Sequence, residues 1–273
     1  MKNTKICMVI GSPVEHSLSP IMHNTGYKAL GVFGEFFYTS AEIKSKDLAR
    51  FIDAVKLLGI RGVSCTIPDK IEIMKYLDEL DETARKIGAV NTVVNNSGVL
   101  KGYNTDWLGI IEPIKNLMKG GISDKKVALI GAGGASRAVL YGLIGMNFQI
   151  TIFNRNLDKA RDLALEFGVN FESLDEIYKV KDFDVIINAT PIGMGEYVGI
   201  SPVPKEFIDK NHICFDIVYN PMDTEFLKLA RIRGAKVIYG IEMLLYQGIA
   251  QFEMFTGLKA PVDKMRKALI DNL

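Results

Sequence analysis

The stretch KVALIGAGGAS, residues 126–136, constrains the fold of this chain more than any other. An apolar strand runs directly into closely spaced glycines, and a helical pattern follows over residues 135–144. Gly131 permits a tight turn, Gly133 lets backbone N–H groups approach a pyrophosphate, and the helix N-terminus offers unpaired donors. This context favours a dinucleotide site over a simple turn, with the pyrophosphate held by Gly131, Ala132, Gly133, Gly134 and Ala135.

The end of the next strand indicates which dinucleotide binds. An NAD site places an acidic residue there, about 20 residues after the turn, to bind the ribose 2′-hydroxyl. Here the strand ends in Asn154-Arg155, with Lys159 one helical turn further on. A guanidinium suits a 2′-phosphate and a carboxylate would repel it, so the sequence favours NADP(H) held by Asn154, Arg155 and Lys159.

On both sides of this unit, short apolar runs alternate with helical periodicity, as in Leu48, Phe51, Ile52, Val55 and Leu58. Such alternation predicts an α/β fold: an N-terminal domain with a mostly parallel sheet, a Rossmann-type dinucleotide-binding domain, and a cleft between them. We expect the first domain to cover residues 1–106 and the second 107–242. Helices within 243–273 are expected to pack back on the first domain.

Composition excludes several classes of protein. The 273 residues carry a net charge of +1, so no overall field favours nucleic acid or a membrane surface. Cys7, Cys65 and Cys214 lie far apart in apolar runs, which indicates buried thiols and neither a metal site nor a disulfide framework. No run is long and apolar enough for a transmembrane helix. We expect a cytoplasmic monomer or homodimer with a small-molecule substrate and no bound metal.

Polar clusters lie at the predicted strand ends of the first hundred residues, where α/β sheets place their ligand sites. Separately, each cluster is compatible with a cap, a turn or a solvated loop; Ser19-Pro20, for example, is typical of a helix N-cap followed by proline. Together, and in this order, they resemble the shikimate dehydrogenase family. The matching segments are residues 11–20, 66–70, 88–92, 104–106, 131–135, 154–155, 188–190, 216–221 and 240–247.

The resemblance implies reversible reduction of 3-dehydroshikimate to shikimate with NADPH, a step toward chorismate and the aromatic amino acids. Lys70 and Asp106 match the family's catalytic pair, in which an ammonium oriented by a carboxylate delivers a proton as hydride arrives. Residues matching the substrate site are Ser17 and Ser19 for the carboxylate, Thr66, Asn91, Asp106 and Gln247 for the ring hydroxyls, and Tyr219. Ile217 and Gly240 match positions near the nicotinamide.

Two positions depart from the family's usual pattern. Ser64 stands where the family usually has asparagine, so a longer amide is replaced by a hydroxyl. Asp69 precedes Lys70, where the family often carries a bulky residue, and its carboxylate adds to the negative field around that lysine. Both changes bear on substrate preference, and neither removes a catalytic group.

Two other functions remain open. A quinate/shikimate dehydrogenase of the same superfamily would use NAD, which the lack of an acidic residue beside Arg155 disfavours. A non-catalytic NADP sensor would be expected to lose the catalytic pair, yet Lys70 and Asp106 both stand in their motifs.

Overall fold

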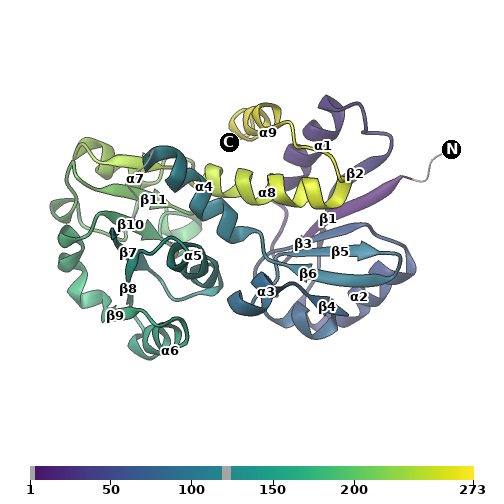
Figure 1. Cartoon of the computed structure of the whole chain (residues 1–273). Coiled ribbons are helices and arrows are strands. Elements are labelled where there is room, and N and C mark those ends of the chain that lie inside the picture. Colours follow the sequence, from purple (N-terminus) through teal and green to yellow (C-terminus); the bar gives the residue numbers. More distant parts are fainter. Residues whose placement is uncertain (1–3, 119–123) are drawn as a thin grey trace. The chain divides into compact units, whose positions relative to one another are not determined.

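The computed structural model describes residues 4–118 and 124–273 (Figure 1). The chain divides into two compact units, one made of Met1–Asp106 with Leu245–Asn272 and the other of Trp107–Leu244. Among the described residues, twelve strands form two six-stranded sheets, one in each unit. No helix in this part of the chain has the length and apolar character needed to cross a membrane.

The first unit contains a mixed sheet with strand order β2-β1-β3-β5-β6-β4. Strand β1 pairs in parallel with β2 and β3, β5 runs antiparallel to β3 and β6, and β4 is parallel to β6. The strand bounds are β1 (Lys5–Gly11), β2 (Phe36–Glu42), β3 (Gly62–Cys65), β4 (Glu79–Leu80), β5 (Thr92–Asn96) and β6 (Val99–Tyr103).

Helices from both ends of the chain complete this unit. The C-terminal helix α9 packs against α1 near the N-terminus, although more than two hundred residues separate them in sequence. One core joins β1 and β3 to α2 through Met8, Ile10, Ile52, Val55 and Val63. The helix bounds are α1 (Ser19–Ala29), α2 (Leu48–Leu57), α3 (Glu82–Ile87), α8 (Gly240–Thr256) and α9 (Val262–Ile270), with 3-10 turns η1 (Ser45–Asp47) and η2 (Glu72–Tyr76).

The second unit contains a sheet with strand order β12-β11-β10-β7-β8-β9, and each of its pairings in the described residues is parallel. The chain moves outward from β7 to β9 and then returns to β10 on the other side of β7. This is the Rossmann order, with its switch point between β7 and β10. The strand bounds are β7 (Lys126–Ile130), β8 (Gln149–Asn154), β9 (Asn170–Ser173), β10 (Val185–Asn188), β11 (Ile213–Asp216) and β12 (Lys236–Ile238).

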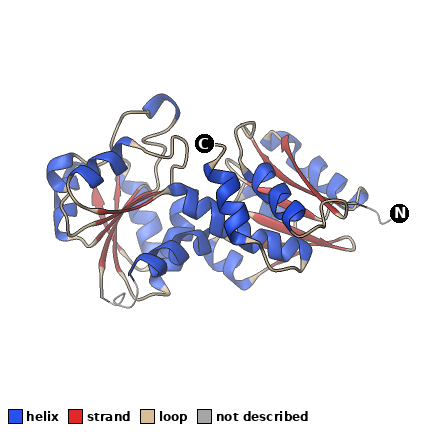
Figure 2. Ribbon diagram, turned by 90° about the horizontal axis from the view of Figure 1, so that it is seen from above, coloured by secondary structure: helices blue, strands red, loops and turns tan. Residues whose placement is uncertain are grey.

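Helices cover both faces of this second sheet (Figure 2). Alternation along β7 sends Val127 and Leu129 into a core with α5, and Ala128 and Ile130 into a core with α7. A parallel sheet buried on both faces needs such continuous apolar strands. The bounds are α4 (Asp106–Met118), α5 (Gly134–Ile144), α6 (Leu157–Phe167) and α7 (Glu225–Ile232), with 3-10 turns η3 (Leu174–Asp182), η4 (Gly195–Tyr197) and η5 (Lys205–Phe207).

The predicted α/β class, with a parallel-rich sheet and a Rossmann-type sheet, is confirmed. The sequence pattern did not indicate β4 or β9, because each is short and half exposed. Ser19 is the first residue of α1 and Leu18 occupies the cap position, so the interpretation of Ser19 as the N-cap was wrong.

Candidate active site

One edge of the first unit's sheet gathers the predicted catalytic residues and the predicted substrate residues other than Tyr219. The segments after β1, β3 and β6 carry the serines, Lys70 and Asp106, and Asn91 directly precedes β5. Since β5 is antiparallel to β3 and β6, its first residue lies beside the last residues of those strands. Topology therefore brings four separate stretches of sequence to the same edge.

Lys70 and Asp106 form an ion pair at this edge. Lys70 Nζ donates to Asp106 Oδ2 at 2.6 Å, and the two side chains are 17% and 6% exposed. The backbone fixes both ends, because Val90 N donates to Lys70 O at 2.7 Å and Asp106 N donates to Asn104 Oδ1 at 3.0 Å. A shielded, oriented ammonium of this kind can deliver a proton to a substrate oxygen.

Asn91 lies behind the ion pair and is 2% exposed. Its Nδ2 atom donates to Asp106 Oδ1 at 2.7 Å and approaches Gln247 Oε1 at 3.5 Å. Its Oδ1 atom accepts from Thr105 N at 2.8 Å, which fixes the orientation of the amide. The structure thus brings together Lys70, Asp106, Asn91 and Gln247, all of which were predicted from the sequence.

The segment after β1 that carries Ser17 and Ser19, called the serine loop, borders the same edge, as does Thr66. Ser19 N donates to Ser17 Oγ at 3.3 Å, which orients the half-buried Ser17 beside the buried Ser19. Thr66 follows β3 directly, and its backbone N donates to Ile10 O at 2.9 Å. The half-buried Thr66 is therefore tied to β1, the strand that leads into the serine loop.

The residues that depart from the family pattern are buried. Ser64 Oγ accepts a hydrogen bond from Tyr38 OH at 2.6 Å and donates to Gln251 Oε1 at 2.8 Å. The hydroxyl is thus occupied inside the protein. Asp69 is also buried, with 4% of its surface exposed. Between these two positions lies Cys65, whose own burial raises the pKa of its thiol to about 12, so the thiol stays protonated.

The glycine-rich turn follows β7 at the switch point of the second sheet. Gly131 has φ +110°, and a Cβ there would lie 2.9 Å from Thr190 Cγ2. Gly133 and Gly134 differ, since a Cβ at either would meet no heavy atom within 4 Å. Ser136 stands where the usual dinucleotide-binding pattern has its third glycine. Its Oγ donates to Gly131 O at 2.9 Å and accepts from Gly133 N at 3.2 Å, so this side chain links the two ends of the turn.

The end of β8 carries the residues predicted to bind the 2′-phosphate. Asn154 Nδ2 donates to Asn156 O at 2.8 Å, and Asn156 Oδ1 in turn caps α6 by accepting from Lys159 N at 2.9 Å. Arg155 and Lys159 are both exposed. Gly131 N donates to Phe153 O at 2.8 Å, which ties the end of β8 to the start of the glycine turn.

Ile217 and Gly240 lie together in the second unit. A Cβ on Gly240 would overlap Val218 O and stand 2.8 Å from the carbonyl carbon of Ile217, so α8 begins in direct contact with that backbone. Tyr219, two residues further on, is half-buried, and burial raises the pKa of its hydroxyl. Tyr219 belongs to this unit, whereas the other predicted substrate residues belong to the first.

A buried polar cluster supports the carboxyl ends of β10 and β11, and the sequence did not single out its members as site residues. Asp216 is fully buried and accepts from Asn188 Nδ2 at 2.9 Å and Thr224 Oγ1 at 2.7 Å. Burial raises its pKa to about 6, against hydrogen bonds that lower it. Asn188 Oδ1 also accepts from Thr190 Oγ1 at 2.6 Å, and Thr190 borders Gly131.

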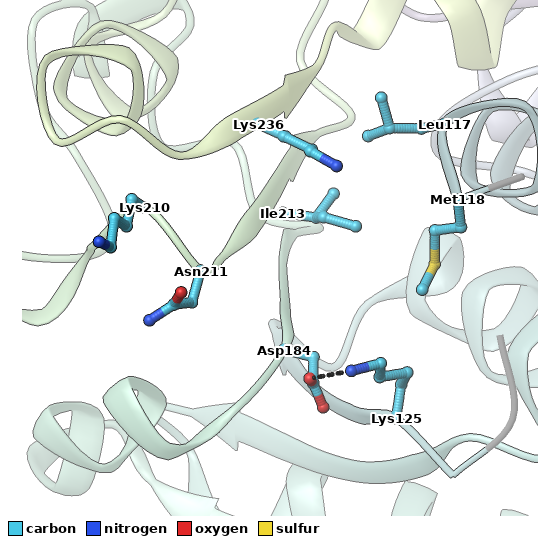
Figure 3. Close-up of a pocket in the computed structure, with 8 residues that line it drawn as sticks. All are labelled: Leu117, Met118, Lys125, Asp184, Lys210, Asn211, Ile213 and Lys236. Atoms are coloured by element: carbon cyan, nitrogen blue, oxygen red, sulfur yellow. Dashed lines mark hydrogen bonds and ion pairs between the residues drawn. The ribbon is translucent and has the colours of Figure 1, made fainter. Parts of the chain in front are cut away.

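A cavity of about 250 Å³ opens at the amino ends of strands in the second sheet, on the opposite side from the glycine-rich turn (Figure 3). It lies at the starts of β7, β11 and β12, whereas the glycine turn follows the end of β7. Lys125 pairs with Asp184 at 2.7 Å across its wall. None of the predicted site residues lines it; the lining consists of Leu117, Met118, Lys125, Asp184, Lys210, Asn211, Ile213 and Lys236.

Three family models match successive parts of the chain. Residues 9–93 match the shikimate dehydrogenase substrate binding domain. Residues 114–217 match shikimate / quinate 5-dehydrogenase, and residues 240–270 match the shikimate 5′-dehydrogenase C-terminal domain.

Relatives match over almost the whole chain. A shikimate dehydrogenase (NADP(+)) from Methanococcus maripaludis strain C7 is 44% identical, over 97% of this chain and 96% of that protein. A crystal structure of shikimate dehydrogenase with NADP⁺ has a TM-score of 0.93 at 42% identity, covering 99% of this chain and 97% of that one. The Thermus thermophilus enzyme with NADP(H) and shikimate has a TM-score of 0.91 at 34% identity, covering 99% and 100%. This chain therefore belongs to the shikimate dehydrogenase family.

Proposed function

We propose that this chain catalyses the reversible NADPH-dependent reduction of 3-dehydroshikimate to shikimate, a step in the synthesis of chorismate and the aromatic amino acids. The observation that carries the proposal is the shielded Lys70–Asp106 ion pair, joined at one sheet edge by Asn91 and Gln247. Residues 1–106, with the C-terminal helices, bind the substrate, and residues 107–242 bind the dinucleotide.

The substrate is a small acid with several hydroxyl groups, and such a ligand needs several directional donors and acceptors. Ser17, on the loop after β1, and Ser19, the first residue of α1, bind its carboxylate through their hydroxyls. Thr66, Asn91 and Gln247 contact the ring hydroxyls from the same sheet edge, together with Asp106. Tyr219 adds a further hydroxyl.

Lys70 moves the proton. In the reducing direction an Nζ–H bond of its ammonium breaks as a new O–H bond forms on the substrate oxygen. In the oxidising direction the neutral amine takes that proton back. Asp106 orients Lys70 through the 2.6 Å contact, and Asn91 holds the other carboxylate oxygen.

The second unit fits NADP(H). The open space over Gly133 and Gly134, at the N-terminus of α5, leaves room for a pyrophosphate against the backbone of the turn that runs from Gly131 through Ala132 to Ala135. Asn154, Arg155 and Lys159 bind the 2′-phosphate end, and Ile217 and Gly240 border the nicotinamide. When bound, NADPH supplies the hydride for the carbonyl carbon.

The enzyme acts in the cytoplasm as a monomer or a homodimer. Three buried, unbridged thiols are consistent with a reducing compartment. Sedimentation equilibrium distinguishes the two assemblies by mass, and a larger mass would contradict both.

The direct test measures initial rates with shikimate and with quinate, each against NADP⁺ and NAD⁺. We expect the highest kcat/KM for shikimate with NADP⁺. Faster turnover of quinate with NAD⁺ would make the chain a quinate dehydrogenase, and binding of NADP⁺ with neither alcohol oxidised would indicate a sensor.

Replacing Lys70 tests the mechanism itself. Lys70→Ala removes the proton donor, so kcat falls by about 10²–10⁴-fold while NADP⁺ binding stays near that of the wild type. Lys75→Ala is the matched control, because Lys75 forms an exposed ion pair with Glu72. Turnover by Lys70→Ala at the control's rate would exclude Lys70 as the acid.

A further inference from the structure

A buried chain of hydrogen bonds leads from Tyr38 on β2 to Asp106. Tyr38 OH donates to Ser64 Oγ, and Ser64 Oγ donates to Gln251 Oε1. Gln251 Nε2 then donates to Thr92 Oγ1 at 2.9 Å. The five side chains from Tyr38 through Ser64, Gln251 and Thr92 to Asn91 are each buried, so water does not compete for these bonds.

The backbone fixes the direction of this chain at Gln251. Gln251 Nε2 faces the carbonyl oxygen of Asn91 at 3.4 Å as well as the Thr92 hydroxyl. A carbonyl oxygen only accepts, so the nitrogen end of the amide must point there and the oxygen end toward Ser64. The opposite orientation would set two acceptors against each other in a buried site.

Thr92 transmits this direction because a hydroxyl has a single hydrogen. Its oxygen accepts from Gln251, which leaves that hydrogen for Asn91 Oδ1 at 2.7 Å. Asn91 then has its oxygen engaged by Thr92 and by Thr105 N, and its nitrogen faces Asp106 Oδ1. Thr92 thus adds a second donor to the oxygen that Thr105 N already holds, and the Asn91 nitrogen meets the carboxylate that pairs with Lys70.

We propose that Gln251 and Thr92 are positioning residues for the reaction, and that Ser64 and Tyr38 hold Gln251 in the orientation this requires. This inference rests on the proposed function, since it assigns a role to side chains that support Asn91, Asp106 and Lys70. It also assigns a role to Ser64, whose hydroxyl donates to Gln251 Oε1 and so helps to hold the Gln251 amide inside the protein.

The placement of Gln251 on α8 supports this role. Gln247 and Gln251 are one helical turn apart, so their side chains share a face of α8. Gln247 approaches Asn91 Nδ2 directly, whereas Gln251 reaches the same side chain through Thr92. One helix face therefore carries both a proposed substrate ligand, Gln247, and the residue that supports Asn91 through Thr92.

The test compares variants that remove a hydrogen-bonding group with little change of shape. Thr92→Val removes the hydroxyl and Thr92→Ser keeps it, while Gln251→Met keeps the side-chain length without the amide. We expect Thr92→Val and Gln251→Met each to lower kcat/KM for shikimate by about fivefold to tenfold, because each weakens the one hydrogen bond from Thr92 to Asn91. Thr92→Ser should retain activity, and KM for NADP⁺ should stay unchanged in all three.

A double variant distinguishes a shared chain of hydrogen bonds from two independent effects on kcat/KM. The double variant Thr92→Val with Gln251→Met should lose no more than the larger single loss, because both changes interrupt the same series. Asn95→Ala is the control, since Asn95 is buried on the same strand but bonds to Val55 O and Gly98 N, outside the chain. It should lower the melting temperature without changing kcat/KM.

Losses that multiply in the double variant, or wild-type kcat/KM in Thr92→Val, would overturn the proposal. Crystal structures of Thr92→Val and Thr92→Ser give an answer that does not depend on activity. The 2.7 Å contact from Asn91 Nδ2 to Asp106 should lengthen in the first and persist in the second. An unchanged contact in both rejects the positioning role even if the wild type proves inactive on shikimate.

Discussion

Gly133→Ala separates the folding role of the glycine turn from its role in binding. Gly133 has φ −95° and ψ −172°, a conformation that alanine adopts, and its added methyl would meet no protein atom within 4 Å. Alanine is a poorer N-cap than glycine, yet it also restricts the unfolded chain, so the free energy of unfolding should change by less than about 1 kcal/mol.

The same methyl would fill the space that the proposed pyrophosphate occupies. Displacing a phosphate from backbone donors loses charge-assisted hydrogen bonds of about 1.5–3 kcal/mol each, so the Kd for NADPH should rise about 10- to 100-fold. Gly131→Ala is the contrasting variant, because φ +110° and the 2.9 Å approach to Thr190 strain the fold itself. It should lower the free energy of unfolding by about 1–3 kcal/mol.

Urea unfolding and fluorescence titration with NADPH measure the two effects separately. Shikimate binding, measured by calorimetry, is the control, because the predicted shikimate ligands other than Tyr219 belong to the first unit. If Gly133→Ala folds and binds NADPH within about twofold of the wild type, the turn does not hold the pyrophosphate and the reasoning is refuted.

Three further outcomes follow from the structure. Arg155→Ala should raise KM for NADP⁺ by about 10-fold or more and leave KM for NAD⁺ unchanged, whereas Arg161→Ala, an exposed change on α6, should alter neither in steady-state assays. Burial raises the pKa of Asp216 in the folded chain from 3.8 to about 6, so the folded chain holds that proton more tightly than the unfolded chain does. Above pH 6 this carboxyl therefore lowers the free energy of unfolding by about 3 kcal/mol, and the loss becomes smaller as the pH falls toward 4. Asp216→Asn should remove that pH dependence from urea unfolding curves. Arg61→Met should lower the free energy of unfolding in urea by about 2–4 kcal/mol, because Arg61 donates to the carbonyl oxygens of Met254 and Phe255 at the end of α8. A variant as stable as the wild type would show that these hydrogen bonds are dispensable.

The sequence alone was sufficient to predict those parts of the fold that are determined by residues adjacent in the chain. The apolar strand before Gly131, the glycines and the helix after them predicted the Rossmann turn, because strand period, turn and helix start all lie within one stretch. The ordered motifs that resemble the shikimate dehydrogenase family likewise named the family and the Lys70–Asp106 pair. The short half-exposed strands β4 and β9 had no such local signal.

Contacts between distant residues required the folded chain. Gln251 meets Ser64 across 187 positions of sequence, and Arg61 meets Phe255 across 194. No periodicity or motif records such a pairing, because it depends on which helix face packs against which strand. The glycine turn shows the same division: the sequence named both glycines, but only the fold shows that a side chain at position 131 is excluded by Thr190 while position 133 stands open for a ligand.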